Sequence, residues 1–143
     1  MKKFILFVTV GVIAFALVYN VKLIYFSDDD RSPKQPINFS HKVHAGTNQM
    51  DCKYCHYGAA NSAWANIPAM STCMGCHKIV ATDKPEVQKL TAFYDRGEQV
   101  PWIKVHYLPD HVKFNHKRHL AAGFACQECH GPIQEMDVVY QYN

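Results

Sequence analysis

The chain has 143 residues, a length that predicts a single domain, and its formal net charge of +3 at pH 7 is too small to indicate a nucleic-acid-binding protein. Hydrophobic residues make up 48% of the chain, an ordinary share for a globular protein, but many of them lie near the N-terminus. The remainder is polar and loop-rich, so we expect it to bury only a modest polypeptide core.

The N-terminal part of the chain contains a long apolar segment. Lys2 and Lys3 precede an apolar run over residues 4–26, which three polar residues interrupt. As a helix this run spans about 35 Å, enough to cross the hydrocarbon core of a bilayer. Because no Ala-x-Ala cleavage pattern follows it, we expect residues 1–27 to form an uncleaved signal-anchor transmembrane helix, with a cleaved signal peptide as the alternative. The two lysines then orient the N-terminus toward the cytoplasm, in a bacterial cytoplasmic membrane, and residues 28–143 toward the periplasm.

A charged linker with two prolines, residues 27–36, leads to a sequence element that occurs twice. The pattern Phe-x-His-x-x-His stands at residues 39–44 and returns at residues 114–119, each time a short spacer ahead of a cysteine motif. Two histidines separated by three positions share one face of a helix. One short helix can therefore present its two imidazoles to two different metal ions.

The pentapeptide Cys-x-x-Cys-His occurs three times, at residues 52–56, 73–77 and 126–130, and these first, second and third motifs contain every cysteine of the chain. It is the attachment signature of c-type haem, in which two thiols form thioethers and the histidine ligates the iron. A zinc site or a disulfide framework leaves the histidine after every second cysteine unexplained. The sequence therefore predicts three haem c groups. The expected attachment residues and proximal ligands are Cys52, Cys55, Cys73, Cys76, Cys126 and Cys129 with His56, His77 and His130.

Six further histidines could supply the second axial ligand, twice as many as three haems need. The candidate distal ligands are His41, His44, His106, His116 and His119. The sixth, His111, is expected to lie on the surface. Methionine ligation is the alternative, as in many cytochromes c, and is less favoured because histidines are plentiful and precede the motifs closely. The methionines in question are Met50, Met70, Met74 and Met136.

Between the motifs we expect mostly irregular chain. Residues 57–72 indicate loops and turns, and residues 100–110 an extended segment. One longer helix is predicted after Asp83, the expected N-cap, and is expected to end at Gly97. Residues 136–143 are typical of a strand or a tail.

The Phe-x-His-x-x-His element ahead of Cys-x-x-Cys-His resembles the class III multihaem cytochromes c. The resemblance implies a mostly irregular and α-helical fold with little regular secondary structure, built around closely packed bis-histidine haems. In those proteins the first histidine of the pair ligates the haem that follows it, and the second reaches another haem. Carried over, His41 serves the first motif and His116 the third, while either His44 or His106 completes the second.

A second resemblance covers nearly the whole chain. Residues 39–45, 67–77, 85–90, 102–119 and 130–141 resemble the N-terminal part of the membrane-anchored pentahaem cytochrome c subunit of alternative complex III. That complex oxidises quinol and passes electrons to periplasmic carriers or directly to an oxidase. The resemblance implies partner subunits of iron–sulfur, molybdopterin-like and integral membrane type, and a periplasmic cytochrome or oxidase as acceptor. Members of that family continue into two more attachment motifs, which this sequence does not contain.

The expected function is electron transfer by a membrane-bound subunit without catalytic residues. Bis-histidine ligation leaves no open iron position for a substrate and gives a lower potential than histidine–methionine ligation. The main alternative is a soluble periplasmic electron shuttle, released by cleavage after the apolar run. A small-molecule reductase of the nitrite type would need an open haem position, and a haem-based sensor would need a signalling domain.

Overall fold

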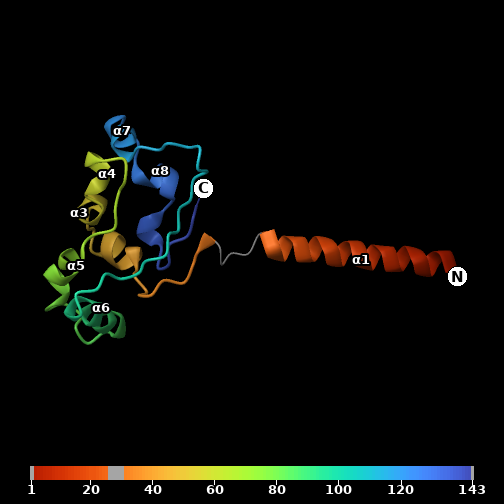
Figure 1. Cartoon of the computed structure of the whole chain (residues 1–143), viewed down its shortest axis with the longest axis horizontal. Helices are drawn as coiled ribbons and strands as arrows, with labels where there is room; N and C mark the ends of the chain where they lie inside the picture. The colour runs from red at the N-terminus through yellow and green to blue at the C-terminus, as the bar shows by residue number, and fades with distance from the viewer. Residues whose placement is uncertain (1, 26–30, 143) are drawn as a thin grey trace. The chain divides into compact units, whose positions relative to one another are not determined.

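The computed structural model describes residues 2–25 and 31–142 (Figure 1). Contacts within the chain divide it into two compact units, Met1–Arg31 and Ser32–Asn143. The expected boundary between anchor and haem domain, after residue 27, lies outside the described residues.

The first unit contains helix α1, Lys2–Tyr25, which has 24 residues. Its sequence has no proline, and its apolar residues are distributed around the helix, so no single face is set apart for packing on a core. The side chain of Asn20 donates a hydrogen bond to the carbonyl oxygen of Ala16, 2.7 Å away and one turn earlier. Among the residues that the structure describes, no helix meets the length and apolarity required to cross a membrane.

The second unit consists of short helices joined by irregular chain, and up to residue 142 it contains no strand (Figure 1). Its elements are η1 (Lys42–Thr47, a π-helix), α3 (Cys52–Cys55), α4 (Gly58–Asn61), α5 (Met70–His77), α6 (Pro85–Asp95), α7 (His116–Ala121), α8 (Cys126–His130) and η2 (Ile133–Glu135, a 3-10 helix). The mostly helical and irregular fold expected for residues 28–143 is confirmed, whereas the transmembrane helix expected ahead of them is not shown by the described residues. Residues 136–142 are irregular rather than a strand.

The polypeptide core of the second unit is small. Its main cluster lies where α5 and α6 meet and contains Ile37, Met70, Met74, Leu90 and Val100. Three further hydrophobic side chains are buried elsewhere, and among the described residues no polar side chain is buried. Polar contacts also link the irregular segments to one another.

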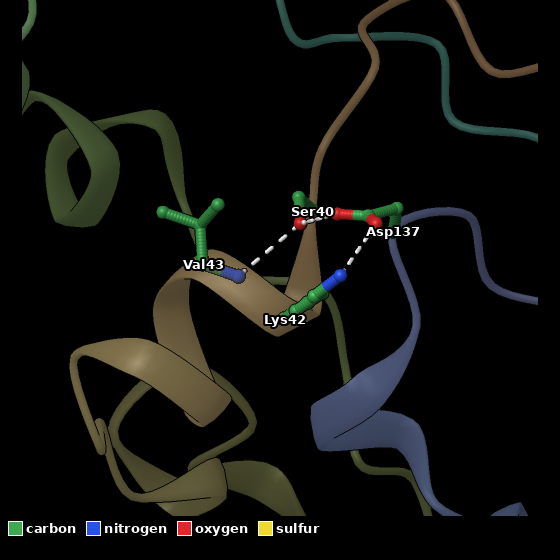
Figure 2. A network of polar contacts seen from close by, with 4 residues as sticks. All are labelled: Ser40, Lys42, Val43 and Asp137. Atoms are coloured by element: carbon green, nitrogen blue, oxygen red, sulfur yellow. Dashed lines mark hydrogen bonds and ion pairs between the residues drawn. The ribbon is translucent and has the colours of Figure 1, made fainter.

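One such contact fixes the segment in front of η1 (Figure 2). Asp137 accepts a hydrogen bond from the Ser40 hydroxyl, 2.8 Å away, and its second carboxylate oxygen lies 3.3 Å from Nζ of Lys42. The Ser40 oxygen in turn accepts from the N–H of Val43 at 3.2 Å, as an N-cap does. The start of η1 is thereby tied to the chain that follows η2.

Helix α6 differs from expectation at its start. It begins at Pro85 with Lys84 as N-cap and without a side-chain cap, so the expected cap at Asp83 is wrong. The Asp83 carboxylate lies 3.3 Å from Nζ of Lys84 instead. Proline suits the first helical position because its fixed φ matches the helix and its missing N–H has no intrahelical partner there. The helix ends before Gly97, whose φ of +68° favours glycine, as expected.

Glu86, in the first turn of α6, makes a contact that the sequence did not indicate. Its Oε2 accepts a hydrogen bond from the backbone N–H of Asn38 at 2.8 Å, and its Oε1 lies 2.7 Å from Nζ of Lys89. Both contacts lower the pKa of the Glu86 carboxyl, the hydrogen bond from Lys89 most. Helix α6 is thereby linked to the segment that leads into η1.

Candidate haem sites

Each Cys-x-x-Cys-His motif lies on a short helix or at its end. The first motif begins α3, the second ends α5 and the third forms α8. The Asp51 side chain accepts from the N–H of Lys53 at 2.7 Å ahead of α3, and Glu128 accepts from the N–H of Ala125 at 2.8 Å around α8. These caps favour helices that begin at the first cysteine of the motif. Helical geometry then brings both cysteines, three positions apart, to one face.

The proximal histidines of the first two motifs are oriented by backbone carbonyls. Nδ1 of His56 lies 2.6 Å from the carbonyl oxygen of Asn66, and Nδ1 of His77 lies 3.1 Å from that of Val80. A carbonyl oxygen only accepts, so each Nδ1 carries the proton and donates it. In the neutral ring this arrangement leaves Nε2 as the lone-pair nitrogen, which is the atom that ligates a metal.

Two pairs of histidines face one another with nearly parallel rings. The ring centres of His41 and His56 are 6.4 Å apart at 6°, and those of His116 and His130 are 6.4 Å apart at 4°. A metal–imidazole bond is about 2 Å long and the ligating nitrogen lies roughly 1 Å from the ring centre, so two imidazoles on opposite sides of one iron have centres about 6 Å apart. Both pairs therefore have the separation that a six-coordinate haem iron requires.

A third pair has the same separation but a different orientation. The rings of His44 and His77 are 6.0 Å apart at an angle of 64°. Nδ1 of His44 donates to the carbonyl oxygen of Ser40 at 2.8 Å, which leaves its Nε2 available. Of the two histidines expected to serve the second motif, His44 is thus the one that lies beside the histidine of that motif, His77.

His106 has a different position from the other candidate ligands. Its Nε2 lies 3.1 Å from Nδ1 of His130, and the two rings are 4.4 Å apart at 84°. This separation leaves no room for an iron between them. His106 therefore contacts Nδ1 of His130, whereas in the other two motifs a backbone carbonyl oxygen contacts Nδ1 of the histidine. The sequence showed only that a histidine precedes the third motif, not that it contacts the motif's own histidine.

His119 also stands apart. Its Nδ1 donates to the carbonyl oxygen of Asn115 at 2.8 Å, and its ring lies on that of Phe114 at 4.3 Å. All nine histidines are among the described residues, and His119 and His111 are the two whose rings contact no other histidine ring. His111 is exposed, as expected, whereas His119 is partly buried.

Burial controls the protonation of the histidines at the centre of the unit. It lowers the pKa of His41 and of His130 to about 4, and neighbouring histidines add to the effect. It also lowers the pKa of His106. These rings are therefore neutral at pH 7, which is the state in which imidazole ligates a metal. Nδ1 of His41 is buried without a hydrogen-bond partner in the described part of the chain.

Thiols of different motifs lie close together. The pKa of Cys52 is raised by burial and by the neighbouring thiol of Cys126, in the third motif. That of Cys55 is raised by burial and by Cys73 and Cys76, in the second. The first motif therefore has neighbours in both of the others. The six cysteines form no disulfide within the described residues.

Three of the four methionines considered as ligands are buried in the polypeptide. Met70, Met74 and Met136 are only 6%, 3% and 5% exposed, and the first two belong to the main apolar cluster. Met50 is half-buried.

In the described residues, cysteines and histidines gather into no group of three or more of the kind that holds a zinc ion. The opposed histidine pairs beside thiol pairs fit haem c: the thiols would attach the macrocycle and the two imidazoles would hold its iron.

Comparison with known proteins agrees with this chemistry. The cytochrome c3 family matches residues 43–131, which is more than half of the chain. The chain is similar to the multihaem cytochrome c subunit of menaquinone reductase from Nitratidesulfovibrio vulgaris (strain Hildenborough), with 39% identity over 98 residues. This match covers 68% of the chain and 46% of the relative, so the chain spans about half of that relative's length.

A second relative is close to the chain in size. Cytochrome c3 from Desulfovibrio desulfuricans is 30% identical over 99 residues, which cover 68% of the chain and 79% of the relative. The region that the family matches, residues 43–131, contains all three cysteine motifs in full and the second Phe-x-His-x-x-His element. The family carries c-type haem and transfers electrons. The chain belongs to the cytochrome c3 family of multihaem cytochromes c, and it is an electron carrier rather than a catalytic enzyme.

Proposed function

We propose that this chain is a membrane-anchored electron-transfer subunit that holds three bis-histidine haem c groups and relays electrons between a quinone-linked membrane complex and periplasmic partners. The observation that carries the proposal is the set of three histidine pairs with ring centres 6.0–6.4 Å apart, one pair for each cysteine motif. Bound haem supplies a one-electron iron couple. The residues of the chain attach it, close both of its axial positions and set its surroundings.

The proposed ligand pairs are His41 with His56 for the first motif, His44 with His77 for the second, and His116 with His130 for the third. With both axial positions held by protein, no substrate reaches the metal. This arrangement supports electron transfer over the nitrite-type reductase.

Shared structure around the first pair supports a continuous relay. His41 and His44 belong to one helical turn at η1, so the first and second pairs are built on the same element. Residues 62–66 serve the first and third pairs together, since the carbonyl of Asn66 orients His56 and that of Ala63 accepts from Nδ1 of His116 at 2.9 Å. The first pair therefore shares a structural element with each of the other two pairs.

The apolar helix supports the membrane location. Helix α1 has 24 residues, with apolar residues on every side and two lysines at its start, although within the described residues no helix meets the criterion for crossing a membrane. The amide of Asn20 bonds to the helix's own backbone, which reduces the cost of placing it in a bilayer. We infer a signal-anchor in the cytoplasmic membrane, with the N-terminus in the cytoplasm and residues 28–143 in the periplasm. The soluble shuttle differs from this only in cleavage after the apolar run.

The partners are inferred from relatives. The subunit named for menaquinone reductase supports other subunits of a quinone-linked complex as partners. Electron flow from quinol to a periplasmic cytochrome or oxidase follows from the resemblance to the subunit of alternative complex III. The name of the relative favours a second candidate with the opposite direction, from periplasmic donors to menaquinone.

The test is to produce the chain in a host that attaches c-type haem and to measure intact mass, haem content and low-temperature EPR spectra. We expect three covalent haems, all low-spin, and recovery of the protein in the membrane fraction. A high-spin signal that responds to nitrite would sink the electron-relay proposal in favour of the reductase. Recovery of a shortened chain in the periplasmic fraction would support the soluble shuttle. Midpoint potentials measured against the menaquinone couple then distinguish the two directions.

A further inference from the structure

We propose that residues 58–66, which comprise α4 and the loop after it, form a shared positioning element that sets the reduction potentials of the first and third haem sites together. Gly58, Ser62 and Asn66 are the positioning residues of this bridging segment. They lie outside the cysteine motifs and the Phe-x-His-x-x-His elements, and they act through carbonyl groups of the segment. The inference rests on the proposed function, because it takes the two parallel histidine pairs as axial ligands.

The bridging segment contacts one histidine of each parallel pair. The carbonyl oxygen of Asn66 lies 2.6 Å from Nδ1 of His56, and that of Ala63 lies 2.9 Å from Nδ1 of His116. A carbonyl oxygen only accepts, so both rings donate from Nδ1 and keep Nε2 for a metal. Such a hydrogen bond makes imidazole a more basic ligand, which stabilises the oxidised iron. The potentials of two sites therefore depend on carbonyl groups that belong to one short segment.

Helix α7, which begins with His116, is fixed to the same segment through its backbone. The N–H groups of His116 and Lys117 donate to the carbonyl oxygens of Ala63 at 3.2 Å and of Ser62 at 3.1 Å. The N–H groups of a first helical turn have no partner inside the helix, so the bridging segment supplies two of the acceptors that α7 needs. Helices α4 and α7 are also in contact (Figure 1). A displacement of the segment therefore moves both the backbone of His116 and the carbonyl group that its ring contacts.

Three residues hold the bridging segment in one conformation. The Ser62 hydroxyl donates to the carbonyl oxygen of Trp64 at 2.6 Å and accepts from the N–H of the same residue at 3.1 Å. Asn66 has a φ of +64°, in the left-handed region that asparagine adopts more readily than most residues. Gly58 is buried, and a Cβ atom there would lie 2.5 Å from the carbonyl oxygen of Trp64 and 2.9 Å from that of Ala65. Substitutions at these positions therefore displace the carbonyl groups that face the two imidazoles.

The second site lies outside this arrangement and supplies an internal reference. Nδ1 of His77 lies 3.1 Å from the carbonyl oxygen of Val80, and Nδ1 of His44 lies 2.8 Å from that of Ser40. Neither carbonyl group belongs to the bridging segment. A change confined to that segment should therefore leave the potential of the second site as it is.

The test compares two variants of the three-haem protein. Asn66→Val places a β-branched residue in the left-handed region, beside the carbonyl group that His56 contacts. Ser62→Ala removes the hydroxyl that holds the turn beside Ala63. NMR signals of the haem methyl groups, followed through a redox titration, give the potential of each site separately. We expect each variant to raise the potentials of the first and third sites together, by about fivefold in each equilibrium constant for reduction, which is what one hydrogen bond contributes.

Matched controls separate a positioning role from a general loss of stability. Asn66→Gly keeps the left-handed backbone without strain and should retain the potentials of the unaltered protein. Ser32→Ala should retain them too, because it removes a serine–carbonyl hydrogen bond of 3.1 Å elsewhere in the unit. The second site should keep its potential in all four variants.

The proposal requires that both sites respond to each variant. A shift of the first site alone in Asn66→Val, with a shift of the third alone in Ser62→Ala, would show two independent contacts and overturn it. Unchanged potentials in both variants would do the same. If Asn66→Val fails to receive haem, the first-site potential in Ser62→Ala decides the question. An unaltered protein without three low-spin haems would instead count against the proposed function.

Discussion

Nε2 of His106 lies 3.1 Å from Nδ1 of His130, so the proximal histidine of the third motif is hydrogen-bonded to another imidazole and not to a backbone carbonyl. When Nε2 of His130 ligates iron, its Nδ1 carries a proton and donates it to His106. Partial transfer of this proton makes His130 a more basic ligand, which stabilises the oxidised iron. If His130 ligates a haem as proposed, His106 is a positioning residue that tunes that site.

Replacing His106 should raise one reduction potential. A hydrogen bond contributes about 1 kcal/mol, which corresponds to about 40 mV for a one-electron couple, so His106→Ala should raise the potential of the third-motif site by tens of millivolts. His106→Gln, whose carbonyl oxygen can still accept, should recover part of the shift. The measurement is a spectroscopic redox titration, with His111→Ala as control. An unchanged titration in His106→Ala would show that the contact has no electronic effect.

The angles between the rings predict two kinds of EPR signal. Parallel imidazole planes separate two of the iron d-orbitals and give rhombic low-spin spectra, whereas strongly rotated planes leave them close in energy and give highly anisotropic spectra. The pairs at 6° and 4° should therefore contribute two rhombic components, and the His44–His77 pair at 64° one anisotropic component. Three similar rhombic signals would contradict the geometry of the second site.

The assignment of His44 to the second motif can be tested by deletion. His44→Ala should convert one of the three irons to high-spin and remove the anisotropic EPR component, because no second imidazole is left beside His77. His106→Ala should leave all three irons low-spin, because His106 closes no axial position. If His106→Ala instead produces the high-spin iron, the roles of the two histidines are reversed.

The contact between Asp137, Ser40 and Lys42 should make the stability of the fold depend on pH in the acidic range (Figure 2). Hydrogen bonds from Ser40 and then Lys42 lower the pKa of Asp137 below its usual 3.8. A group whose pKa is lower in the folded state stabilises the fold above its unfolded pKa, and this stabilisation is lost as the pH falls through the folded value. Asp137→Asn should therefore lower the melting temperature slightly at pH 7 and make no difference in stronger acid, as followed by circular dichroism. Because the pair is exposed, added salt should reduce the effect.

Residue patterns predicted some features of the haem sites and not others. The spacings within Cys-x-x-Cys-His and between the two histidines of Phe-x-His-x-x-His span about one helical turn, so the sequence predicts which of these side chains share a face. The attachment and ligation of haem by these residues stay predictions. The choice between His44 and His106 depends on how the extended segment around residue 106 crosses the unit. No local pattern contains that information. For the same reason the tertiary contact of Glu86 with Asn38 was not foreseen.

The start of α6 shows a limit of a different kind. Asp83 and Glu86 match the capping pattern, but the proline at position 85 settles where the helix begins, and Lys84 becomes the N-cap. A strong backbone constraint at one residue thus overrides a side-chain preference at its neighbour.

The small polypeptide core bears on how the protein matures. Few side chains of the second unit are buried by protein alone, so folding without cofactor gains little free energy against the loss of chain entropy. Before haem is added, we expect the polypeptide to stay largely unfolded, with its thiols accessible to the enzymes that attach haem. Ligation of each iron by two distant histidines then closes the chain on itself. Folding is thereby confined to the compartment in which the cofactor is added, and a polypeptide that fails to receive haem is left open to proteolysis.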